Sequence, residues 1–372
     1  MIFTDVEEHN NEVTLILLGD IFDLTAGWEA DYMPCDNDGK ITDEDLLYLI
    51  LNEIISHNPE TINELRKFLQ VSDKSRIVLT NGNHDNVIIL DGFLRKLIAS
   101  ALLPEACEDE QNERILFAKS VEAPDLRLFG NHGNKSDHFN YSEQNASTIG
   151  DWLTIKINIL RKNVIGKTRQ SSLPSDAKEK IIDDLKRLAD IRPVLTPTYL
   201  QILAKHYYEL YKKLDLVLAK KIYELITSFS EDVGKVLIDF PLIEKITKRL
   251  PILRHLASSR RFQAIVGKVG ALFEERKADN NASQIKAASA LARTKRYDFF
   301  VYGHTHNVEH KRDQFHFVNV GTWKPEIRRI KNGNGLPTPI LQKGALRLST
   351  DLSQNRRRRE IRYSTLQSNE VK

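Results

Sequence analysis

The sequence predicts an α/β fold interrupted by a long helical segment, and two observations carry this prediction. Four short runs consist mostly of apolar β-branched and aromatic residues, which is typical of strands buried on both faces of a sheet. A long central stretch instead places apolar residues at helical spacing and has little strand character. The four runs are residues 14–18, 76–80, 126–129 and 299–302.

Each of these runs is closely followed by a short polar motif. The motifs are Gly-Asp-Ile-Phe-Asp at 19–23, Gly-Asn-His-Asp at 82–85, Asn-His-Gly at 131–133 and Gly-His-Thr-His at 303–306. Open α/β sheets place their ligand sites just beyond the carboxyl ends of the strands. We therefore expect the polar side chains of the four motifs to meet in one site.

The candidate ligands in these motifs offer oxygen and imidazole nitrogen and no thiolate, a set that suits Mn, Fe or Zn rather than a sulfur-rich structural zinc site. The two histidines of the last motif lie close together on a loop, so they can diverge toward two ions that a carboxylate bridges. Two divalent ions about 3.5–4 Å apart form the clamp used in phosphate ester hydrolysis. The predicted ligands are Asp20, Asn83, His132, His304 and His306.

The motifs resemble those of the calcineurin-like metallophosphoesterase family. That family carries, in order, Asp-x-His, Gly-Asp-x-x-Asp, Gly-Asn-His followed by Asp or Glu, a histidine-containing turn and Gly-His-x-His, and the last four are present here. The resemblance covers the first ~140 residues and about 25 residues from Asp298, which one such domain can accommodate. It implies a four-layer α/β/β/α metallophosphatase sandwich with an inserted helical domain.

The resemblance also implies a role for each predicted ligand. Asp20 matches the residue that bridges both metals, whereas Asn83, His132 and His304 match ligands of one metal. His306 matches a ligand of the other metal. The implied cofactors are therefore two divalent ions.

Three further residues have expected roles around the metals. His84 matches the histidine that contacts the phosphate and protonates the leaving group, and Asp85 is expected to orient its ring. Asp23 is expected to support the site from behind rather than to bind a metal.

The expected activity is hydrolysis of a phosphomonoester, phosphodiester or pyrophosphate bond by water that the metal pair activates. The expected substrate is a phosphorylated small molecule or lipid. The string Gly-Asp-Ile-Phe-Asp-Leu at 19–24 is similar to that of the UDP-2,3-diacylglucosamine hydrolases, which also carry a helical insertion. Those enzymes generally have arginine where this chain has His84, so a lipid-nucleotide pyrophosphate is a minority substrate option.

The family's first motif, Asp-x-His, has no match in this chain. Asp5 and Glu7 end a strand-like segment, but roughly eight residues separate it from the run at 14–18, fewer than a parallel crossover needs. We therefore expect this sequence to begin inside the first crossover helix. Either the true start of the protein lies upstream, or the gene is truncated. The second metal site keeps Asp20 and His306 and is expected to be weakened, since losing even a supporting residue costs about 10–100-fold in metal affinity or activity.

The alternative is a catalytically impaired or inactive protein that uses the same fold for binding or scaffolding. The missing first motif supports this alternative. Five ligand-type residues and His84 at strand ends favour an enzyme, because a binding module has no physical need for that set.

The expected organisation is a discontinuous metallophosphoesterase domain at 1–139 and 298–350, a helical insertion at 140–297, and a C-terminal strand and tail at 351–372. Pro174 marks a helix start within the insertion. Both ends of the insertion join metal-bearing strands, so it can act as a lid or substrate selector, with a structural or dimerisation appendage as the alternative. Its second half is basic. Basic residues along amphipathic helices more often form a solvated face than contact phosphate-rich substrate or nucleic acid.

Two other patterns have ordinary explanations. Residues 36–41 imitate the centre of a calcium-binding EF-hand loop, but that frame puts Pro34 and Asp45 where a side-chain oxygen and a bidentate glutamate are needed. A polar loop that caps the next helix is favoured. The arginine run at 356–359 leads into an alternating segment that, with residues 345–348, predicts a late hairpin or edge strand.

The composition bounds the setting of the protein. With 372 residues, 41% of them hydrophobic, the chain can bury a large core and form two units. The net charge of +3 is small and does not by itself indicate nucleic acid binding. No apolar segment spans a bilayer, the first residues lack the basic region of a signal peptide, and Cys35 and Cys107 are too few for a disulfide framework. A cytoplasmic location is therefore expected.

Overall fold

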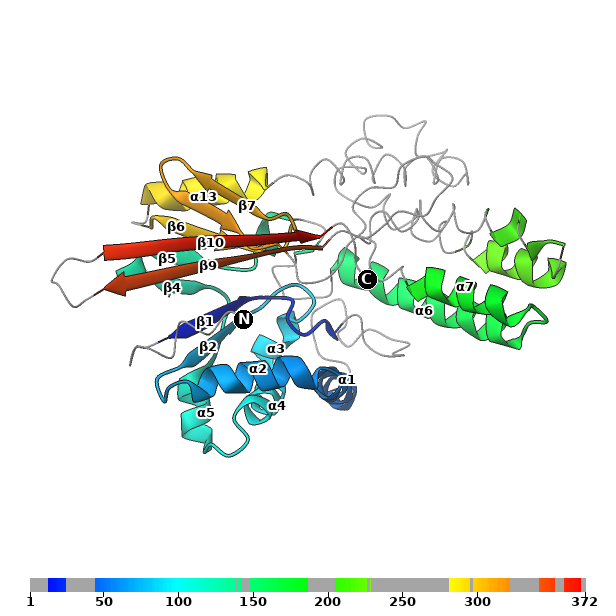
Figure 1. The fold of residues 1–372 in the computed structure, drawn as a ribbon, viewed down its shortest axis with the longest axis horizontal. Helices are drawn as coiled ribbons and strands as arrows, with labels where there is room; N and C mark the ends of the chain where they lie inside the picture. Colours follow the sequence, from blue (N-terminus) through cyan, green and yellow to red (C-terminus); the bar gives the residue numbers. More distant parts are fainter. Residues whose placement is uncertain are drawn as a thin grey trace.

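The computed structural model describes residues 13–24, 44–137, 140–141, 148–186, 281–294, 297–321, 341–351 and 358–368, and most of 205–225. Within these residues the chain combines helices with a parallel sheet and a mixed sheet, which confirms the predicted α/β class. Figure 1 shows the arrangement of these elements.

The first sheet consists of three parallel strands in the order β1-β2-β3. They are β1 (Thr14–Leu18), β2 (Arg76–Thr80) and β3 (Ile115–Ala118). The predicted runs at 14–18 and 76–80 therefore coincide with β1 and β2. The connecting helices are α1 (Glu44–His57) and α2 (Pro59–Gln70) before β2, and α3 (Asn86–Leu90), α4 (Gly92–Leu102) and α5 (Glu108–Arg114) before β3.

Helices α1, α2 and α4 cover one face of this sheet (Figure 1). Their buried side chains, such as Leu51, Phe68 and Ile98, form one hydrophobic cluster with Ile77 of β2 and Ile115 of β3. This burial against the sheet supplies most of the stability of such amphipathic helices.

Local sequence signals account for the starts of two of these helices. Pro59 opens α2, where its missing N–H costs no helical hydrogen bond. The Asp91 side chain caps α4 by accepting hydrogen bonds from the backbone N–H groups of Phe93 and Leu94 at 2.7 and 2.9 Å.

The second sheet has five strands in the order β4-β5-β6-β8-β7. Its centre, β5-β6-β8, is parallel, and the two outer strands are antiparallel to their neighbours. The strands are β4 (Val121–Ala123), β5 (Leu128–Gly130), β6 (Phe299–Tyr302), β7 (Glu309–Arg312) and β8 (His316–Asn319). The predicted run at 299–302 coincides with β6.

The predicted strand at 126–129 is shifted in the structure. Residues Pro124–Leu126 form a 3₁₀ turn, and Arg127 has a left-handed backbone with φ 51°. The strand β5 therefore begins at Leu128, because an extended strand cannot include a residue with positive φ.

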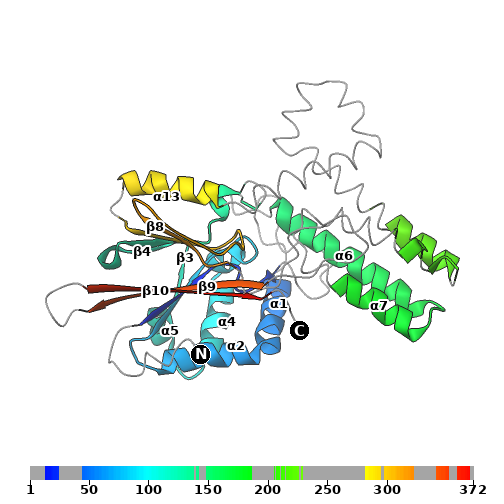
Figure 2. The same ribbon diagram turned by 45° about the horizontal axis from the view of Figure 1, so that its top comes forward.

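The two sheets pack face to face, with helices on their outer faces (Figure 2). Phe299 and Val301 of β6 face the first sheet, where Ile16 and Leu18 of β1 pack against their cluster. The alternate residues of the same strand, including Phe300, pack on the opposite side. The alternation follows from the two-residue period of a strand.

The helix on the outer face of the second sheet is α13 (Ala282–Thr294). Ala288 of this helix is fully buried in a cluster with Phe129, Phe300 and Phe317 of the sheet. The sequence places this helix in the insertion at 140–297, whereas the structure packs it with the sheet. Helical periodicity predicts the helix but does not identify the surface against which it packs.

The described helices of the insertion extend away from the sheets (Figures 1 and 2). They include α6 (Ile149–Gln170) and α7 (Ser175–Lys186), and α7 begins where Pro174 marks a helix start. Buried side chains such as Val164 and Ile181 belong to this unit. Among the helices that the structure describes, none is long and apolar enough to cross a membrane.

A long hairpin follows the second sheet in the chain. Strands β9 (Leu341–Asp351) and β10 (Arg358–Ser368) pair antiparallel, which confirms the hairpin predicted near 345–348. The predicted domain boundary at 350 falls near the end of β9, so it separates two strands that pair with each other.

Several predictions concern segments outside the described residues. These segments are the start of the chain at 1–12, the calcium-like loop at 34–41 and the basic stretch at 245–268.

Our first prediction tests the packing of α13 on the sheet. Ala288→Leu should lower the free energy of unfolding by about 1–3 kcal/mol, because the larger side chain has no room beside the sheet. The matched change Ala290→Leu on the exposed face of the same helix should stay within about 0.5 kcal/mol of the wild type. Urea unfolding measures both values, and equal effects would contradict the described packing.

Candidate metal centre

The candidate ligands lie where strands of both sheets end. Asp20 follows β1 and the 82–85 motif follows β2 in the first sheet, whereas His132 follows β5 and His304 follows β6 in the second. The hydrogen bond from Gly303 N to the His132 carbonyl, 3.0 Å long, joins the last two loops. Parallel pairing within each sheet and the stacking of the sheets thus bring these loops together.

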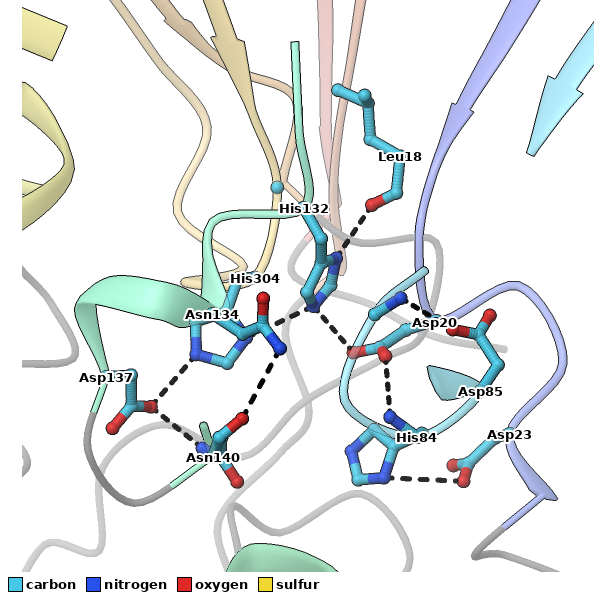
Figure 3. Close-up of polar contacts among 12 residues, drawn as sticks. Leu18, Asp20, Asp23, His84, Asp85, His132, Asn134, Asp137, Asn140 and His304 are labelled. Carbon is cyan, nitrogen blue, oxygen red and sulfur yellow. Dashed lines mark hydrogen bonds and ion pairs between the residues drawn. The ribbon is translucent and has the colours of Figure 1, made fainter. Parts of the chain in front are cut away.

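Three side chains from these loops converge on one point (Figure 3). His132 Nε2 lies 3.0 Å from Asp20 Oδ2, and His304 Nδ1 lies 3.1 Å from His132 Nε2. Among the described residues, this trio forms the group of His, Cys, Asp or Glu whose potential ligand atoms all lie within 4.8 Å of one another. One carboxylate and two imidazoles grouped in this way could hold a metal ion.

The outer nitrogen of each imidazole is tied to an oxygen. His132 Nδ1 donates to the Leu18 carbonyl at 2.7 Å, and His304 Nε2 donates to Asp137 Oδ2 at 2.9 Å (Figure 3). Each ring therefore directs its other nitrogen toward the shared point. Metal-binding histidines are commonly oriented by such bonds on the ring nitrogen that faces away from the metal.

The loops that carry these ligands contain several residues with left-handed backbone. Asp20, His304 and His306 have φ values of 52°, 66° and 57°, a conformation that is sparsely populated for residues other than glycine. Gly19, with φ 75°, precedes Asp20, and a Cβ there would lie 2.6 Å from Gly82 N. Position 19 therefore favours glycine for two reasons: its positive φ and the lack of space for a Cβ atom.

A buried polar network supports the loop with His304 and His306. Asn319, at the end of β8, donates to the Gly303 carbonyl at 2.7 Å and to Thr305 Oγ1 at 3.0 Å. Gln284 of α13 donates to the same carbonyl at 3.0 Å. Sequence reasoning missed both residues, and the available signal was a polar residue within an otherwise apolar strand or helix face.

The contacts determine the charges of the site. Burial alone would raise the pKa of Asp20, but the charges of His132 and His84 and their hydrogen bonds hold that pKa well below its usual range. Burial would lower the pKa of His132, but the charge and hydrogen bond of Asp20 raise it above its usual value. Burial lowers the pKa of His304, and Asp137 offsets only part of this effect. These shifts favour the charged forms of Asp20 and His132 and the neutral form of His304.

The structure assigns different partners to two aspartates of the predicted site. The Asp85 carboxylate accepts backbone N–H groups of Gly82 at 2.6 Å and Ile21 at 2.8 Å, so it ties the two loops of the first sheet together. The carboxylate that faces the His84 ring belongs to Asp23, with Oδ1 3.7 Å from Nδ1 (Figure 3). The Asp85 carboxylate thus holds backbone groups, whereas the Asp23 carboxylate lies within ion-pair distance of the His84 ring. Burial, and then the Asp20 charge, raise the pKa of Asp85 to about 6.

Asn83 also fits a metal site. Its Oδ1 atom is buried and has no hydrogen-bond partner among the described residues, whereas buried polar atoms are normally paired. The backbone N–H of the next residue, His84, donates to Asp20 Oδ1 at 3.0 Å, so Asn83 precedes a residue that contacts one of the trio. A neutral amide oxygen, a carboxylate and two imidazoles form a donor set that suits Mn, Fe or Zn. The residues present thus fit one divalent ion.

His306, the ligand expected for a second ion, does not belong to the trio of Asp20, His132 and His304. It lies half-buried in the same loop as His304. The structure thus brings together three of the predicted ligands: Asp20, His132 and His304.

Comparisons of the chain with protein-family models, with curated proteins and with solved structures find no match. What the site does is therefore inferred from its residues.

Our second prediction concerns the contact between Gly82 and Asp20. A Cβ on Gly82 would lie 1.9 Å from Asp20 Oδ1, so Gly82→Ala must displace the carboxylate or the loop. We expect a loss of about 1–3 kcal/mol in the free energy of unfolding, together with weaker metal binding. Gly166→Ala in α6 is the control, because a Cβ there meets nothing within 4 Å, and it should stabilise the helix by about 0.5–1 kcal/mol. Urea unfolding with metal titration measures both effects, and equal behaviour of the two variants would refute this loop packing.

The third prediction concerns pH. The folded-state pKa of His132 is raised, so the stabilisation from its ion pair with Asp20 is fully present below the unfolded pKa of 6.5 and disappears as pH rises through the folded pKa. The pKa shifts of Asp85 and His304 change the stability mainly below pH 6.5, so they leave the decline above pH 6.5 visible. Chelator-treated protein should therefore lose stability toward urea as pH rises above 6.5.

Asp20→Asn is the control for this prediction, because it removes the charge that raises the pKa of His132. The decline above pH 6.5 should be shallower in this variant. A decline of equal slope in both proteins would show that His132 is not paired with Asp20.

Proposed function

We propose that this chain is a metal-dependent phosphoester hydrolase of the calcineurin-like metallophosphoesterase type. The observation that carries the proposal is the convergence of Asp20, His132 and His304 beyond strands of two stacked sheets. Three of the family's motifs, in the expected order, supply these residues, and the packing order of helices and sheets agrees with the sandwich that the resemblance implies. Small polar clusters arise by chance, but this one combines ligand chemistry, strand-end placement and an adjacent acid–base histidine.

In the proposed site Asp20, His132, His304 and Asn83 hold the first divalent ion. When bound, such an ion acidifies water and draws electron density from a phosphoryl oxygen. Asp20 Oδ1 accepts a hydrogen bond from the backbone N–H of His84, and this bond orients the carboxylate so that Oδ2 faces His132. A second ion would use Asp20 and His306, as the resemblance implies.

His84 is the proposed proton donor to the departing alkoxide. Its ring is partly exposed, with 22% of the side-chain surface accessible, so a substrate can reach it. The Asp23 carboxylate faces this ring, with Oδ1 3.7 Å from Nδ1. Asp85 fixes the loop that carries His84 by accepting the backbone N–H groups of Gly82 and Ile21. General acid catalysis of this kind contributes typically about 10²–10⁴-fold in rate.

The proposed substrate is a phosphorylated small molecule or lipid with a phosphomonoester, phosphodiester or pyrophosphate bond. A lipid-nucleotide pyrophosphate remains the minority option, because His84 stands where the UDP-2,3-diacylglucosamine hydrolases generally have arginine. A binding or scaffolding protein is the competing proposal, and it differs from the hydrolase in turnover.

The fourth prediction tests this function. The full chain, loaded with manganese and freed of excess metal, should contain at least one ion per chain by elemental analysis and should hydrolyse an aryl phosphate diester or monoester. Asp20→Asn should lose both the metal and the activity. His84→Gln should keep the metal and lose about 10²–10⁴-fold in kcat, because it removes only the proton donor.

Asp313→Asn, in the exposed turn before β8, is the control and should match the wild type in both measurements. Bound metal without turnover on any aryl phosphate would favour the scaffold. An absence of metal in the wild type would overturn the proposed site itself.

A further inference from the structure

Asp137 contacts a candidate metal ligand although none of the motifs includes it. It comes five residues after His132, directly after the 3₁₀ turn Asn134–Ser136. Its Oδ2 atom lies 2.9 Å from His304 Nε2, on the nitrogen that faces away from His132 and Asp20 (Figure 3). Asp137 is therefore placed behind His304 rather than among the ligand atoms.

A built turn holds this carboxylate in place. Asn140 Nδ2 donates to the same Oδ2 atom at 2.8 Å, and Asn140 N donates to the Asp137 carbonyl at 3.1 Å. Asp137 N in turn donates to the Asn134 carbonyl at 2.8 Å. The turn starts at Gly133, whose φ of 101° suits glycine and where a Cβ would lie 2.3 Å from Gln284 Nε2. The acceptor offered to His304 is thus fixed before any ligand arrives.

This contact decides which nitrogen of His304 can bind a metal. Because Nε2 donates to the carboxylate, Nδ1 is the nitrogen that carries the lone pair, and it faces His132 Nε2 at 3.1 Å. The two rings meet nearly edge-on at 73°, with centroids 5.0 Å apart. His132 is oriented by the neutral Leu18 carbonyl, whereas His304 is oriented by a charged acceptor, and charge-assisted hydrogen bonds are roughly twice as strong as neutral ones.

We propose that Asp137 is a positioning residue that orients His304, holds its proton on Nε2 and thereby strengthens metal binding by Nδ1. The inference rests on the proposed function in that it takes His304 as a metal ligand. Partners of this kind typically change metal affinity about 10–100-fold.

The test compares Asp137→Ala, Asp137→Asn and the control Asp313→Asn in the full chain. Two measurements are made on each protein. The first is the dissociation constant for manganese by calorimetric titration. The second is a ¹H–¹⁵N imidazole correlation spectrum of the metal-free protein, in which the His304 Nε2 proton is identified by its absence in His304→Gln.

Asp137→Ala should weaken manganese binding about 10–100-fold and lose the slowly exchanging Nε2 proton of His304. Asp137→Asn should show a smaller loss in affinity and should keep that proton signal, because the amide oxygen still accepts a hydrogen bond. A merely structural role of Asp137 would not produce this graded rescue of a single imidazole signal. Unaltered manganese affinity in Asp137→Ala, or an unaltered His304 signal, would overturn the proposal.

These outcomes separate this inference from the proposed function. If the wild type binds manganese without hydrolysing phosphate esters, the hydrolase proposal fails while the Asp137 effect on affinity and on the His304 proton remains. If the variants of Asp137 match the wild type while Asp20→Asn loses metal, the positioning role fails and the metal site stands.

Discussion

The pairing of the Asp20 carboxylate with His132 is the interaction on which the site depends, because it joins the two sheets. Asp20 follows β1 of the first sheet, His132 follows β5 of the second, and their facing atoms are 3.0 Å apart. The pairing forms because Leu18 and its neighbours pack against the inner face of the second sheet. Hydrophobic burial between the sheets thus determines the distance at which two polar loops meet, and His304 completes the group from the adjacent strand.

Such an arrangement has a cost in stability. Burial of the ion pair removes both charges from water, and the left-handed residues Asp20, His304 and His306 add backbone strain. Hydrogen bonds from the Asn319 side chain and to the Asp85 carboxylate offset part of this cost by holding the two sets of loops. Strained backbone and buried charge cluster at functional sites, which is consistent with the proposed metal site.

The strands were predictable from the sequence where burial on both faces produces a continuous apolar run, as at 14–18, 76–80 and 299–302. The prediction failed by two residues at β5, because Arg127 adopts a positive φ that its residue type does not signal. The helix at 282–294 lies within the predicted helical insertion, and the structure packs it against the second sheet. Periodicity describes one face of a helix, whereas its partner depends on packing between distant segments.

The sequence by itself determined the types of the candidate ligands and their placement after strands, since local motifs specify both. The tertiary structure decided which side chains face one another: Asp23 rather than Asp85 beside the His84 ring, and Asp137 behind His304. The physical reason is that a hydrogen bond depends on ångström-scale distance and orientation. Those quantities arise from loop conformation and from the stacking of two sheets, which brings together residues such as Asp20 and His132 that are more than a hundred positions apart in the chain.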